Sequence, residues 1–395
     1  MTAVDGNIYG IPASDSGIVG HGAVGYKLWL NESWLDALGL DRPTTTEEFK
    51  DVLTAFKTQD PNGNGVADEI PLTGAIDTWA GDIHLYLLNA FGYFHEDLLM
   101  LDKNGVFSGC ANTESMKEGL RYINELYEAE LIDPACFTQN DQQLAALGSN
   151  EGDVIVGAAS CGHVGMLLSI NDVERSSMYT CLEPLEGPNG YRGIPFTTEK
   201  RVSNAAFVIT DKCEQPEVAF KLADLFCSED IAVRTQVGIK GKHWDDADPG
   251  TFGMDGVSPA TRQYLTFVTS GEGASENDVW SWTCRLIEPN WKNTFQVVGD
   301  IYDPANYEAR LYQETEKLRP YAAEVLVIPP LFFEAEAASR IAQLKDPLKD
   351  YVKSAVVEFA TGKKNVDTDW DTYVSDLEKL NYSEYIRLYQ ETYDK

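Results

Sequence analysis

The stretch Pro43–Pro71 reads PTTTEEFKDVLTAFKTQDPNGNGVADEIP and joins a helix signal to a loop rich in oxygen donors. Its first half predicts a helix, because both Thr44 with Glu47 and Thr45 with Glu48 fit a capping box, in which each side chain caps the other residue's backbone N–H. Apolar residues then recur at helical spacing as far as Phe56. This helix leads directly into the loop that begins at Asp60.

The loop predicts a calcium site. Calcium prefers about six to eight oxygen ligands, and helix-loop-helix calcium loops space them at alternate positions. Here side-chain oxygens fall at positions 1, 3, 5, 9 and 10, and position 7 offers a backbone carbonyl; these residues are Asp60, Asn62, Asn64, Val66, Asp68 and Glu69. The loop departs from the usual pattern at its end, where position 12 carries no Glu. The alternative is a polar turn with solvated carboxylates, since Asn and Gly are common in turns.

Composition excludes some classes of function. The chain has 395 residues, a hydrophobic content of 43% that can form sizeable cores, and a formal net charge of −32. A field of this sign repels polyanions, so we expect no nucleic-acid partner. The acidity also argues against docking on an anionic membrane surface.

The cysteines give a conflicting indication of compartment. Seven cysteines are scattered along the chain without a CxxC pair or a metal-type spacing. An odd number without a framework indicates free, mostly buried thiols, which alone would favour the cytosol. We find no export signal at the start of the chain and no apolar stretch long enough to span a bilayer.

Strand and helix signals alternate along the first two thirds of the chain, which predicts an α/β protein. Expected strands are Ile8–Pro12, Tyr26–Asn31, Asp153–Ala159 and Ala205–Thr210; expected helices are Glu32–Leu38, Trp79–Phe91, Glu114–Ala129 and Gln215–Cys227. In the last of these helices we expect the apolar side chains to face inward, namely Val218, Leu222, Leu225 and Phe226. The final third is nearly all helix, with expected segments Pro304–Leu318, Glu334–Leu344, Pro347–Thr361, Trp370–Leu380 and Ser383–Tyr393.

Several stretches together resemble a known family. They are Asp5–Pro12 (DGNIYGIP), Leu28–Leu40 (LWLNESWLDALGL), Pro43–Pro71, Pro184–Gly190 (PLEGPNG), Gly238–Gly256 and Phe359–Asp394. In these the chain resembles the extracytoplasmic solute-binding proteins of bacterial ABC importers, family 1, in particular the large oligosaccharide-binding and alginate-binding lipoproteins. The calcium-loop stretch is the most specific of the matches.

The resemblance implies a two-lobed periplasmic-binding-protein-like fold of type II, with a helix-rich C-terminal part and ligand between the lobes. It places lobe one at 1–23 plus 203–255 and lobe two, with the calcium loop, at 24–202 plus 256–395. Lobe one is expected to be incomplete, because the first predicted strand comes at once, so the chain resembles an N-terminally truncated member. The full-length form is expected to be an extracytoplasmic, cell-surface lipoprotein whose signal and anchor are absent from this chain.

The resemblance also directs attention to candidate ligand residues. Sugars are bound by aromatic faces and by planar polar groups that reach their hydroxyls. Trp79 and Asp82 lie in a loop that opens a helix and that by resemblance faces the ligand; the alternative for Trp79 is a core anchor of that helix. Trp280 and Trp282 are two residues apart, so in an extended segment both point to one face, either to stack on sugars or to pack in a core.

Two further candidates are weaker. His163 follows a predicted strand where relatives turn toward ligand, although a lone histidine is more often structural. Arg285 could reach hydroxyls or a carboxylate, although pairing with surface acids is an equal alternative. With Trp79, Asp82, Trp280 and Trp282 they form the expected ligand set.

The expected function is therefore a non-enzymatic receptor that binds an oligosaccharide, more readily a neutral than a strongly anionic one. Its expected partners are the membrane subunits of an ABC permease, and we expect a monomer. One alternative is a glycoside hydrolase that uses paired carboxylates. Another is a calcium-stabilised extracellular binding module without a small ligand. The chain has no HExxH, GxSxG, phosphate-loop or dinucleotide motif, which disfavours other chemistries.

Overall fold

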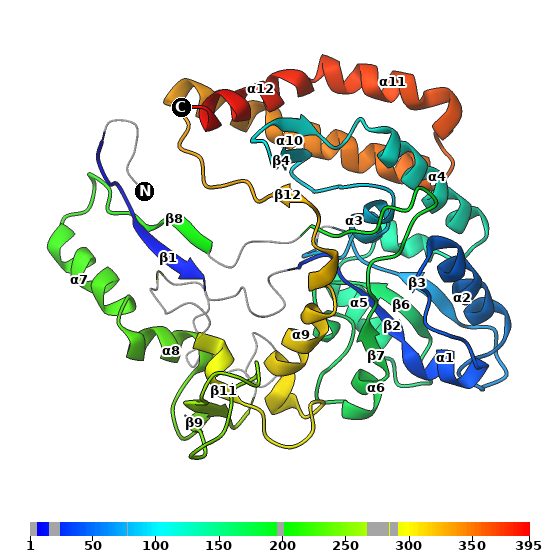
Figure 1. Ribbon diagram of the computed structural model, residues 1–395, viewed down its shortest axis with the longest axis horizontal. Helices are drawn as coiled ribbons and strands as arrows, with labels where there is room; N and C mark the ends of the chain where they lie inside the picture. Colours follow the sequence, from blue (N-terminus) through cyan, green and yellow to red (C-terminus); the bar gives the residue numbers. More distant parts are fainter. Residues whose placement is uncertain (1–5, 16–23, 77, 196–200, 267–283, 285–290) are drawn as a thin grey trace. The chain divides into compact units, whose positions relative to one another are not determined.

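The structure is a computed structural model that describes residues 6–15, 24–76, 78–195, 201–266, 284 and 291–395. The chain forms two compact units. Unit 1 comprises Met1–Ala23 and Thr197–Thr315, and unit 2 comprises Val24–Phe196 and Glu316–Lys395. Each unit is described below by itself (Figure 1).

The unit boundaries differ at two places from the expected lobes. The first boundary follows Ala23 in both, but 197–202 and 256–315 group with unit 1 rather than with the expected second lobe. The reason is a shared core in which side chains from before and after residue 256 pack together. Its members are Ala232, Val233, Val237, Met254, Trp291, Phe295 and Ala309. Burial of apolar surface in one cluster holds these segments in one unit.

Unit 2 is built on two sheets. The larger has the strand order β3-β6-β2-β7, and only β3 and β6 run parallel in it; the smaller is antiparallel with the order β12-β4-β5. Their bounds are β2 Leu28–Asn31, β3 Ile70–Thr73, β4 Leu99–Asp102, β5 Phe107–Gly109, β6 Val156–Ser160, β7 Tyr179–Cys181 and β12 Val325–Leu326. All residues of β2 and β6 are buried, as expected of strands covered on both faces.

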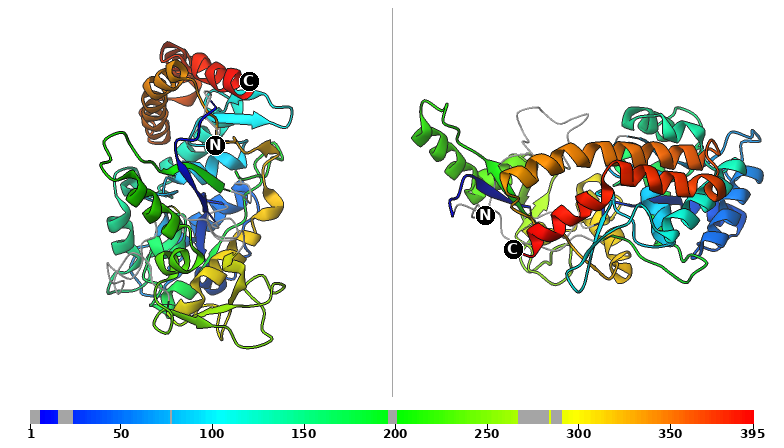
Figure 2. Two further views of the ribbon diagram at one scale, coloured as in Figure 1. Left: turned by 90° about the vertical axis from the view of Figure 1, so that its left-hand side faces the viewer. Right: turned by 90° about the horizontal axis from the view of Figure 1, so that it is seen from above.

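Helices surround these sheets. Their bounds are α1 Glu32–Leu38, α2 Thr46–Thr58, α3 Ile83–Leu87, α4 Glu114–Glu128, α5 Asp141–Gly148, α6 Val173–Ser177, α10 Ala335–Ala360, α11 Val366–Lys379 and α12 Tyr382–Tyr393. The three C-terminal helices lie side by side, and α10 also packs against α4 (Figures 1 and 2). Within the described residues, no helix combines the length and the apolar character needed to cross a bilayer.

The C-terminal helices correct one expectation. We expected a break at Pro347, because proline removes a backbone donor and crowds the preceding turn. Instead α10 runs without interruption through Pro347. Leu344 and Leu348 on either side of it are buried, so packing of the helix against its neighbours compensates for the lost hydrogen bond.

Local sequence sets the helix ends where expected. Thr45 and Glu48 form the capping box at the start of α2, and Asn31 caps α1 by accepting a hydrogen bond from the Trp34 N–H. Asn381 lies between α11 and α12 with φ 64°, the left-handed conformation that asparagine tolerates. These caps satisfy backbone groups that would otherwise lack partners.

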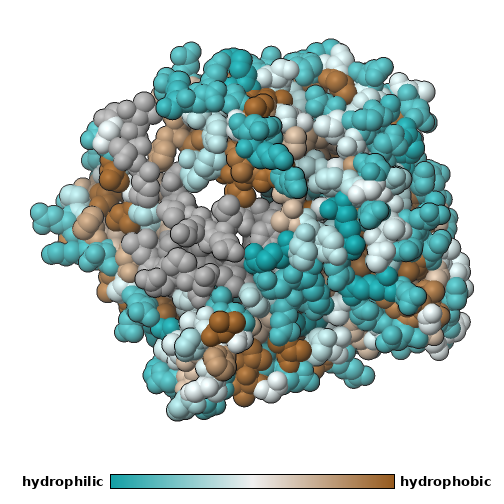
Figure 3. All heavy atoms as spheres, in the orientation of Figure 1, coloured by the Kyte–Doolittle hydropathy of each residue, from teal (hydrophilic) through white to brown (hydrophobic). Residues whose placement is uncertain are grey.

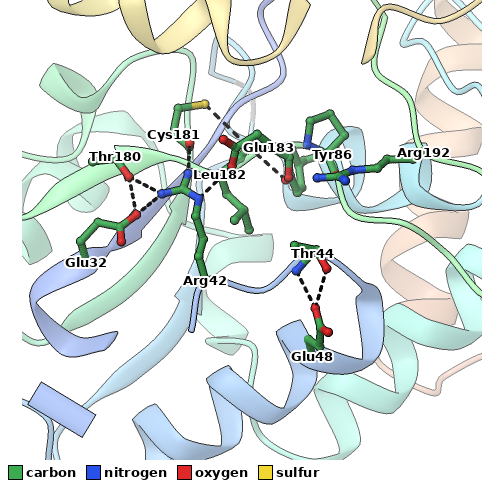
Figure 4. A network of polar contacts seen from close by, with 11 residues as sticks. Glu32, Arg42, Thr44, Glu48, Tyr86, Thr180, Cys181, Leu182, Glu183 and Arg192 are labelled. Carbon is green, nitrogen blue, oxygen red and sulfur yellow. Dashed lines mark hydrogen bonds and ion pairs between the residues drawn. The ribbon is translucent and has the colours of Figure 1, made fainter. Parts of the chain in front are cut away.

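An arginine joins the first helices to the large sheet (Figure 4). The Arg42 guanidinium forms ion pairs with Glu32 and Glu183, the latter at 2.8 Å, and donates to the carbonyl of Cys181 at the end of β7. Tyr86 in α3 donates to the Glu183 carbonyl at 2.6 Å. The guanidinium and the phenol therefore fix the chain that leaves β7 against both α1 and α3.

The described part of unit 1 contains smaller sheets and the helices α7 and α8, together with nearly all of α9. Strand β1 pairs antiparallel with β8, and a second sheet has the order β11-β10-β9. The bounds are β1 Ile11–Asp15, β8 Arg201–Phe207, β9 Trp244–Asp246, β10 Arg262–Tyr264, β11 Phe295–Gln296, α7 Pro216–Phe226, α8 Glu229–Val237 and α9 Tyr307–Glu316. Strands β1 and β8 are each displaced by a few residues from the expected segments.

The expected inward face of α7 is wrong. Val218, Leu222 and Leu225 are 58%, 46% and 52% exposed, and only Ala223 of this helix is buried. The helical spacing was read correctly, but the described part of unit 1 provides no packing partner on that side. Figure 3 shows hydrophilic residues interspersed with apolar ones on one face of the molecule.

Short 3-10 turns complete the described chain: η2 Leu88–Ala90, η3 Pro134–Phe137, η4 Val164–Met166, η5 Trp291–Thr294, η6 Pro304–Asn306 and η7 Arg319–Tyr321.

Candidate functional site

Trp79 lies in a compact turn between β3 and α3. The turn closes through a hydrogen bond of 3.0 Å from the Ala75 N–H to the Gly81 carbonyl. Glycines permit this approach, since a Cβ on Gly74 would lie 2.4 Å from the Gly81 oxygen. Ala80 follows Trp79 with a φ of 55°, an uncommon conformation for a residue with a side chain. The backbone therefore holds Trp79 in one orientation.

The indole of Trp79 lies against the backbone after β6. A Cβ on Gly162 would lie 2.2 Å from the Trp79 Cε3 and Cζ3 atoms and 2.8 Å from Cη2. Because the Cβ position is equally far from Cε3 and Cζ3 and only slightly farther from Cη2, it lies over the ring face rather than beyond the ring edge. The ring is nevertheless 46% exposed. Trp79 is therefore not the core anchor of α3; it rests one face on Gly162 and presents a large aromatic surface to solvent.

His163 is brought to the same place. It follows Gly162 directly, and its ring centroid lies 6.0 Å from that of Trp79 at an angle of 49°. The side chain is half-buried and makes no capping hydrogen bond to η4, which starts at the next residue. Trp79 and His163, expected separately, thus form one aromatic and polar surface in unit 2.

Asp82 lies at the mouth of a neighbouring cavity. It precedes α3, yet its carboxylate makes no capping hydrogen bond and instead lies 3.9 Å from the Lys353 ammonium on α10. The cavity has a volume of about 290 Å³ and is lined among others by Thr78, Asp82, His84, Glu96, Lys349 and Lys353. Thr78, one of the lining residues, directly precedes Trp79 in sequence.

His84 gives the cavity an uncharged polar component. Burial, with a smaller contribution from the Lys353 charge, lowers the pKa of His84 to about 3. The imidazole therefore stays neutral near neutral pH and can offer one donor and one acceptor. The charged groups around it come instead from pairs such as Lys349 and Glu96, whose atoms are 3.8 Å apart.

Three expected ligand residues are not placed. Trp280, Trp282 and Arg285 lie outside the described residues. Their role stays a prediction from the sequence.

The expected calcium loop connects α2 to β3. Asp60 accepts hydrogen bonds from the backbone N–H groups of Asn64 and Gly65, at 3.1 and 3.0 Å. Asp60 itself has a φ of 50°, and Gly63 and Gly65 have φ values of 72° and 75°. These left-handed residues fold the loop back, so that Asn62 also accepts from the Asn64 N–H at 3.1 Å.

The acidic end of the loop lies next to this turn. The side-chain amides of Asn62 and Asn64 each donate to Asp68 at 3.3 Å. The Glu69 Oε1 atom is buried and has no hydrogen-bond partner in the described part of the chain. Burial, and then the charges of Asp68 and Asp60, raise the pKa of Glu69.

These observations test whether the loop fits a hard cation. In the described ranges, no three His, Cys, Asp or Glu side chains converge as a metal cluster. The three carboxylates of the expected donor set, those of Asp60, Asp68 and Glu69, therefore do not converge as such a cluster. A buried Glu69 oxygen without a hydrogen-bond partner, beside two other negative groups, is still an arrangement that a cation would stabilise. The residue types of the loop are those that calcium prefers.

Comparison with known proteins defines the class. A scan against models of protein families finds no match. The fructooligosaccharide ABC transporter substrate-binding protein FusA of Streptococcus pneumoniae is 29% identical over 402 residues, which span 100% of this chain and 71% of FusA. A structure of FusA in complex with kestose matches with a TM-score of 0.80 at 27% identity, over 100% of this chain and 77% of that chain. The alginate-binding protein AlgQ2, solved without calcium ion, matches in fold with a TM-score of 0.69 at 19% identity, over 99% and 75%.

The fold is thus α/β and periplasmic-binding-protein-like, as expected from the resemblance. The chain belongs to the extracellular solute-binding proteins of ABC transporters. This is a class of receptors, so the expectation of a non-enzymatic protein is confirmed and the hydrolase alternative is not supported.

Sequence reasoning missed two residues of the site. Gly162 supports the Trp79 ring, and the only signal for it was its place directly before His163 in the sequence. Lys353 pairs with Asp82 across more than half of the chain, and a lysine on the polar face of a helix gave no signal at all.

Proposed function

We propose that the protein captures an oligosaccharide for uptake through an ABC importer. The observation that carries this proposal is the orientation of Trp79, which is supported by Gly162 on one face and is 46% exposed. An aromatic plane held in this way is what the CH surface of a sugar ring packs against. The relationship to FusA, a fructooligosaccharide-binding protein, supports the same ligand class.

Polar groups around Trp79 would orient the sugar. Asp82 and Lys353 present an acceptor and a donor at the cavity beside the turn, and His163 adds a ring nitrogen on the other side. Sugar hydroxyls both donate and accept, so paired groups of this kind suit them. Opposite charges lie close together around the cavity, which favours a neutral oligosaccharide over a strongly anionic one.

The ligand proposal is tested by calorimetric titration with a panel of neutral fructo- and gluco-oligosaccharides, with a polyuronate fragment for comparison. Trp79→Ala should weaken binding to the best ligand by roughly 30-fold, corresponding to about 2 kcal/mol for an anchoring tryptophan. Phe252→Ala is the matched control, because Phe252 is an aromatic residue of unit 1 that is 59% exposed. Equal affinities of the Trp79 variant and the parent protein would remove Trp79 from the site.

We also propose that the loop Asp60–Glu69 binds a structural calcium ion. Asp60, Asn62, Asn64, Asp68 and Glu69 would provide side-chain oxygens, and Val66 its carbonyl. The bound charge would supply the counter-charge that Glu69 lacks among the described residues. A FusA variant described as an EF-hand mutant has a solved structure that matches this chain with a TM-score of 0.80 at 26% identity, which supports a comparable loop here.

Calcium binding is tested by thermal unfolding with and without a chelator. Anything that binds only the folded state stabilises it, by about 2.7 kcal/mol at a hundredfold excess over Kd. Chelation should therefore lower the Tm of the parent protein, and Asp68→Ala should abolish this response. A parent Tm that is the same in calcium and in chelator would rule the proposal out.

The location, the oligomeric state and the membrane partners are proposed from the class of receptor. We propose that the protein acts at the outside of the cell as a surface lipoprotein, and that it acts as a monomer that delivers ligand to the membrane subunits of a permease. The curated relatives include the lipoprotein LipO of Bacillus subtilis, 23% identical over 62% of this chain and 48% of LipO, in keeping with this location. Light scattering tests the monomer: a mass of twice 43.8 kDa would contradict it.

A further inference from the structure

Two cysteines of unit 1 meet at the end of α7. Cys227 is the C-cap of this helix, and its N–H donates to the Ala223 carbonyl at 3.2 Å. The Cys284 Sγ lies 3.9 Å from the same carbonyl oxygen. Cys227 and Cys284 are far apart in sequence, yet they share one acceptor.

The two thiols also influence each other's charge. Burial raises the pKa of both thiols, and the charge of Cys227 raises that of Cys284 further. Cys227 is half-buried, whereas Cys284 is only 4% exposed. Cys227 is therefore the more accessible thiol of two that lie at one backbone carbonyl.

The other buried cysteines differ from this pair. Cys161 and Cys181 are both fully buried; Cys161 directly follows β6 and Cys181 ends β7, and these strands lie on opposite sides of β2. Their thiols donate to different carbonyls, those of His163 at 3.3 Å and Leu182 at 3.8 Å. Strands on the two sides of β2 are separated by two strand spacings, and this distance exceeds the reach of a disulfide. Cys110 donates to the His95 carbonyl at 3.6 Å, so its sulfur is also directed at the backbone.

We propose that Cys227 and Cys284 form a redox site that closes to an intrachain disulfide on exposure to a small-molecule disulfide such as oxidised glutathione. The Cys227 thiolate attacks one sulfur of the oxidant and releases one glutathione thiol. The Cys284 thiol then loses its proton and attacks the Cys227 sulfur of the mixed disulfide, which releases the second glutathione. One oxidant disulfide is reduced to two thiols, and two protein thiols are oxidised to one disulfide.

The bond would constrain the part of unit 1 that the two cysteines enclose. Helix α8 and strands β9 and β10 lie between Cys227 and Cys284 in sequence. Closing a loop of this length removes conformational freedom from the unfolded chain. Outside the cell, where this class of receptor acts, disulfides persist, so the odd number of cysteines is compatible with one bond and five remaining thiols.

Thiol counting tests the site. The full chain is incubated with oxidised glutathione, unfolded in guanidinium, and titrated with a chromogenic disulfide reagent. We expect the count to fall from seven to five, with no attached glutathione and a mass lower by two hydrogens. A non-reducing peptide map should recover one crosslinked pair that contains Cys227 and Cys284.

Serine variants make the result specific. Cys284→Ser should stop the reaction at a glutathione adduct on Cys227, and Cys227→Ser should leave Cys284 as a thiol. Cys213→Ser is the matched control, because Cys213 is a half-buried thiol of the same unit, and this variant should still lose two thiols. Seven titratable thiols in the parent after oxidation, a stable glutathione adduct in the parent, or a crosslink to any other cysteine would overturn the proposal.

Discussion

The contact between Gly162 and Trp79 leads to a specific prediction about ligand binding. Gly162→Ala adds one methyl group at a position 2.2 Å from the Trp79 Cε3 atom. Carbon atoms in contact are about 3.5 Å apart, so the indole has to move outward by roughly 1.3 Å. Gly162 does not have a left-handed φ, and so the alanine backbone itself is not strained.

The loss of affinity can be worked out from this displacement. A tryptophan that anchors a ligand contributes about 2 kcal/mol or more, so a displaced ring should cost roughly 30-fold in Kd. The free energy of unfolding should change by less than the value for an overpacked core, which is about 1–3 kcal/mol, because the exposed ring can move into solvent. The three atoms nearest to the added methyl all belong to Trp79, so once the ring is gone the methyl has nothing to displace.

A double-mutant cycle provides the assay. Calorimetric Kd values are measured for the parent, Gly162→Ala, Trp79→Ala and the double variant. The double variant should bind as Trp79→Ala does, within about 0.5 kcal/mol, because both changes act through one ring. Gly152→Ala is the matched control, since a Cβ there meets nothing within 4 Å. Losses that multiply, to roughly 900-fold in the double variant, would refute the argument. So would a Gly162→Ala protein that binds as the parent does.

Three more predictions concern stability. Glu69→Gln should raise the unfolding free energy by about 1 kcal/mol in chelator, because it removes a charge of which one oxygen is buried without a hydrogen bond, and should lower it in excess calcium. Chemical denaturation in both buffers checks this, and an effect of one sign in both would contradict it. The Asp97 carboxylate lies 2.9 Å from the Lys345 ammonium. Burial alone would raise the pKa of Asp97, but the hydrogen bond and the positive charge of Lys345 outweigh burial, so the pKa of Asp97 is lowered. The stabilisation by ionised Asp97 is therefore present above the pKa of the unfolded state and is lost as pH falls through the pKa of the folded state. In urea titrations the destabilisation by Asp97→Asn should shrink between about pH 7 and about pH 3. A loss of unfolding free energy that is the same at every pH would exclude this role. Phe56→Ala should cost about 3–5 kcal/mol in the same titrations, since Phe56 is fully buried and packs edge-on against Trp34; a loss below about 1 kcal/mol would mean that the core collapses around the gap.

Local signals predicted the fold well where local interactions decide it. The capping box before α2 and the boundaries of α1 follow from short-range hydrogen bonds; the structure has the second of the two expected boxes, and the boundaries of α1 were placed correctly. The left-handed conformation of Asn381 is likewise one that its residue type tolerates. Packing decided the rest: Pro347 does not interrupt α10, and the apolar residues of α7 are exposed, because neither outcome is determined by neighbouring residues in sequence.

In the candidate site, too, local sequence predicts some residues and does not predict the contacts between distant segments. Trp79 and His163 could be named from their segments, and the structure brings their rings together. The support from Gly162 and the pairing of Asp82 with Lys353 depend on contacts between distant segments, which residue patterns do not encode.

His84 has a consequence for the conditions under which the cavity keeps its character. Proteins outside the cell meet the acidity of their surroundings directly. Because burial lowers the pKa of this imidazole to about 3, mild acidification leaves the imidazole uncharged. A receptor with this interior would hold its ligand with the same polar group in fresh and in acidified medium.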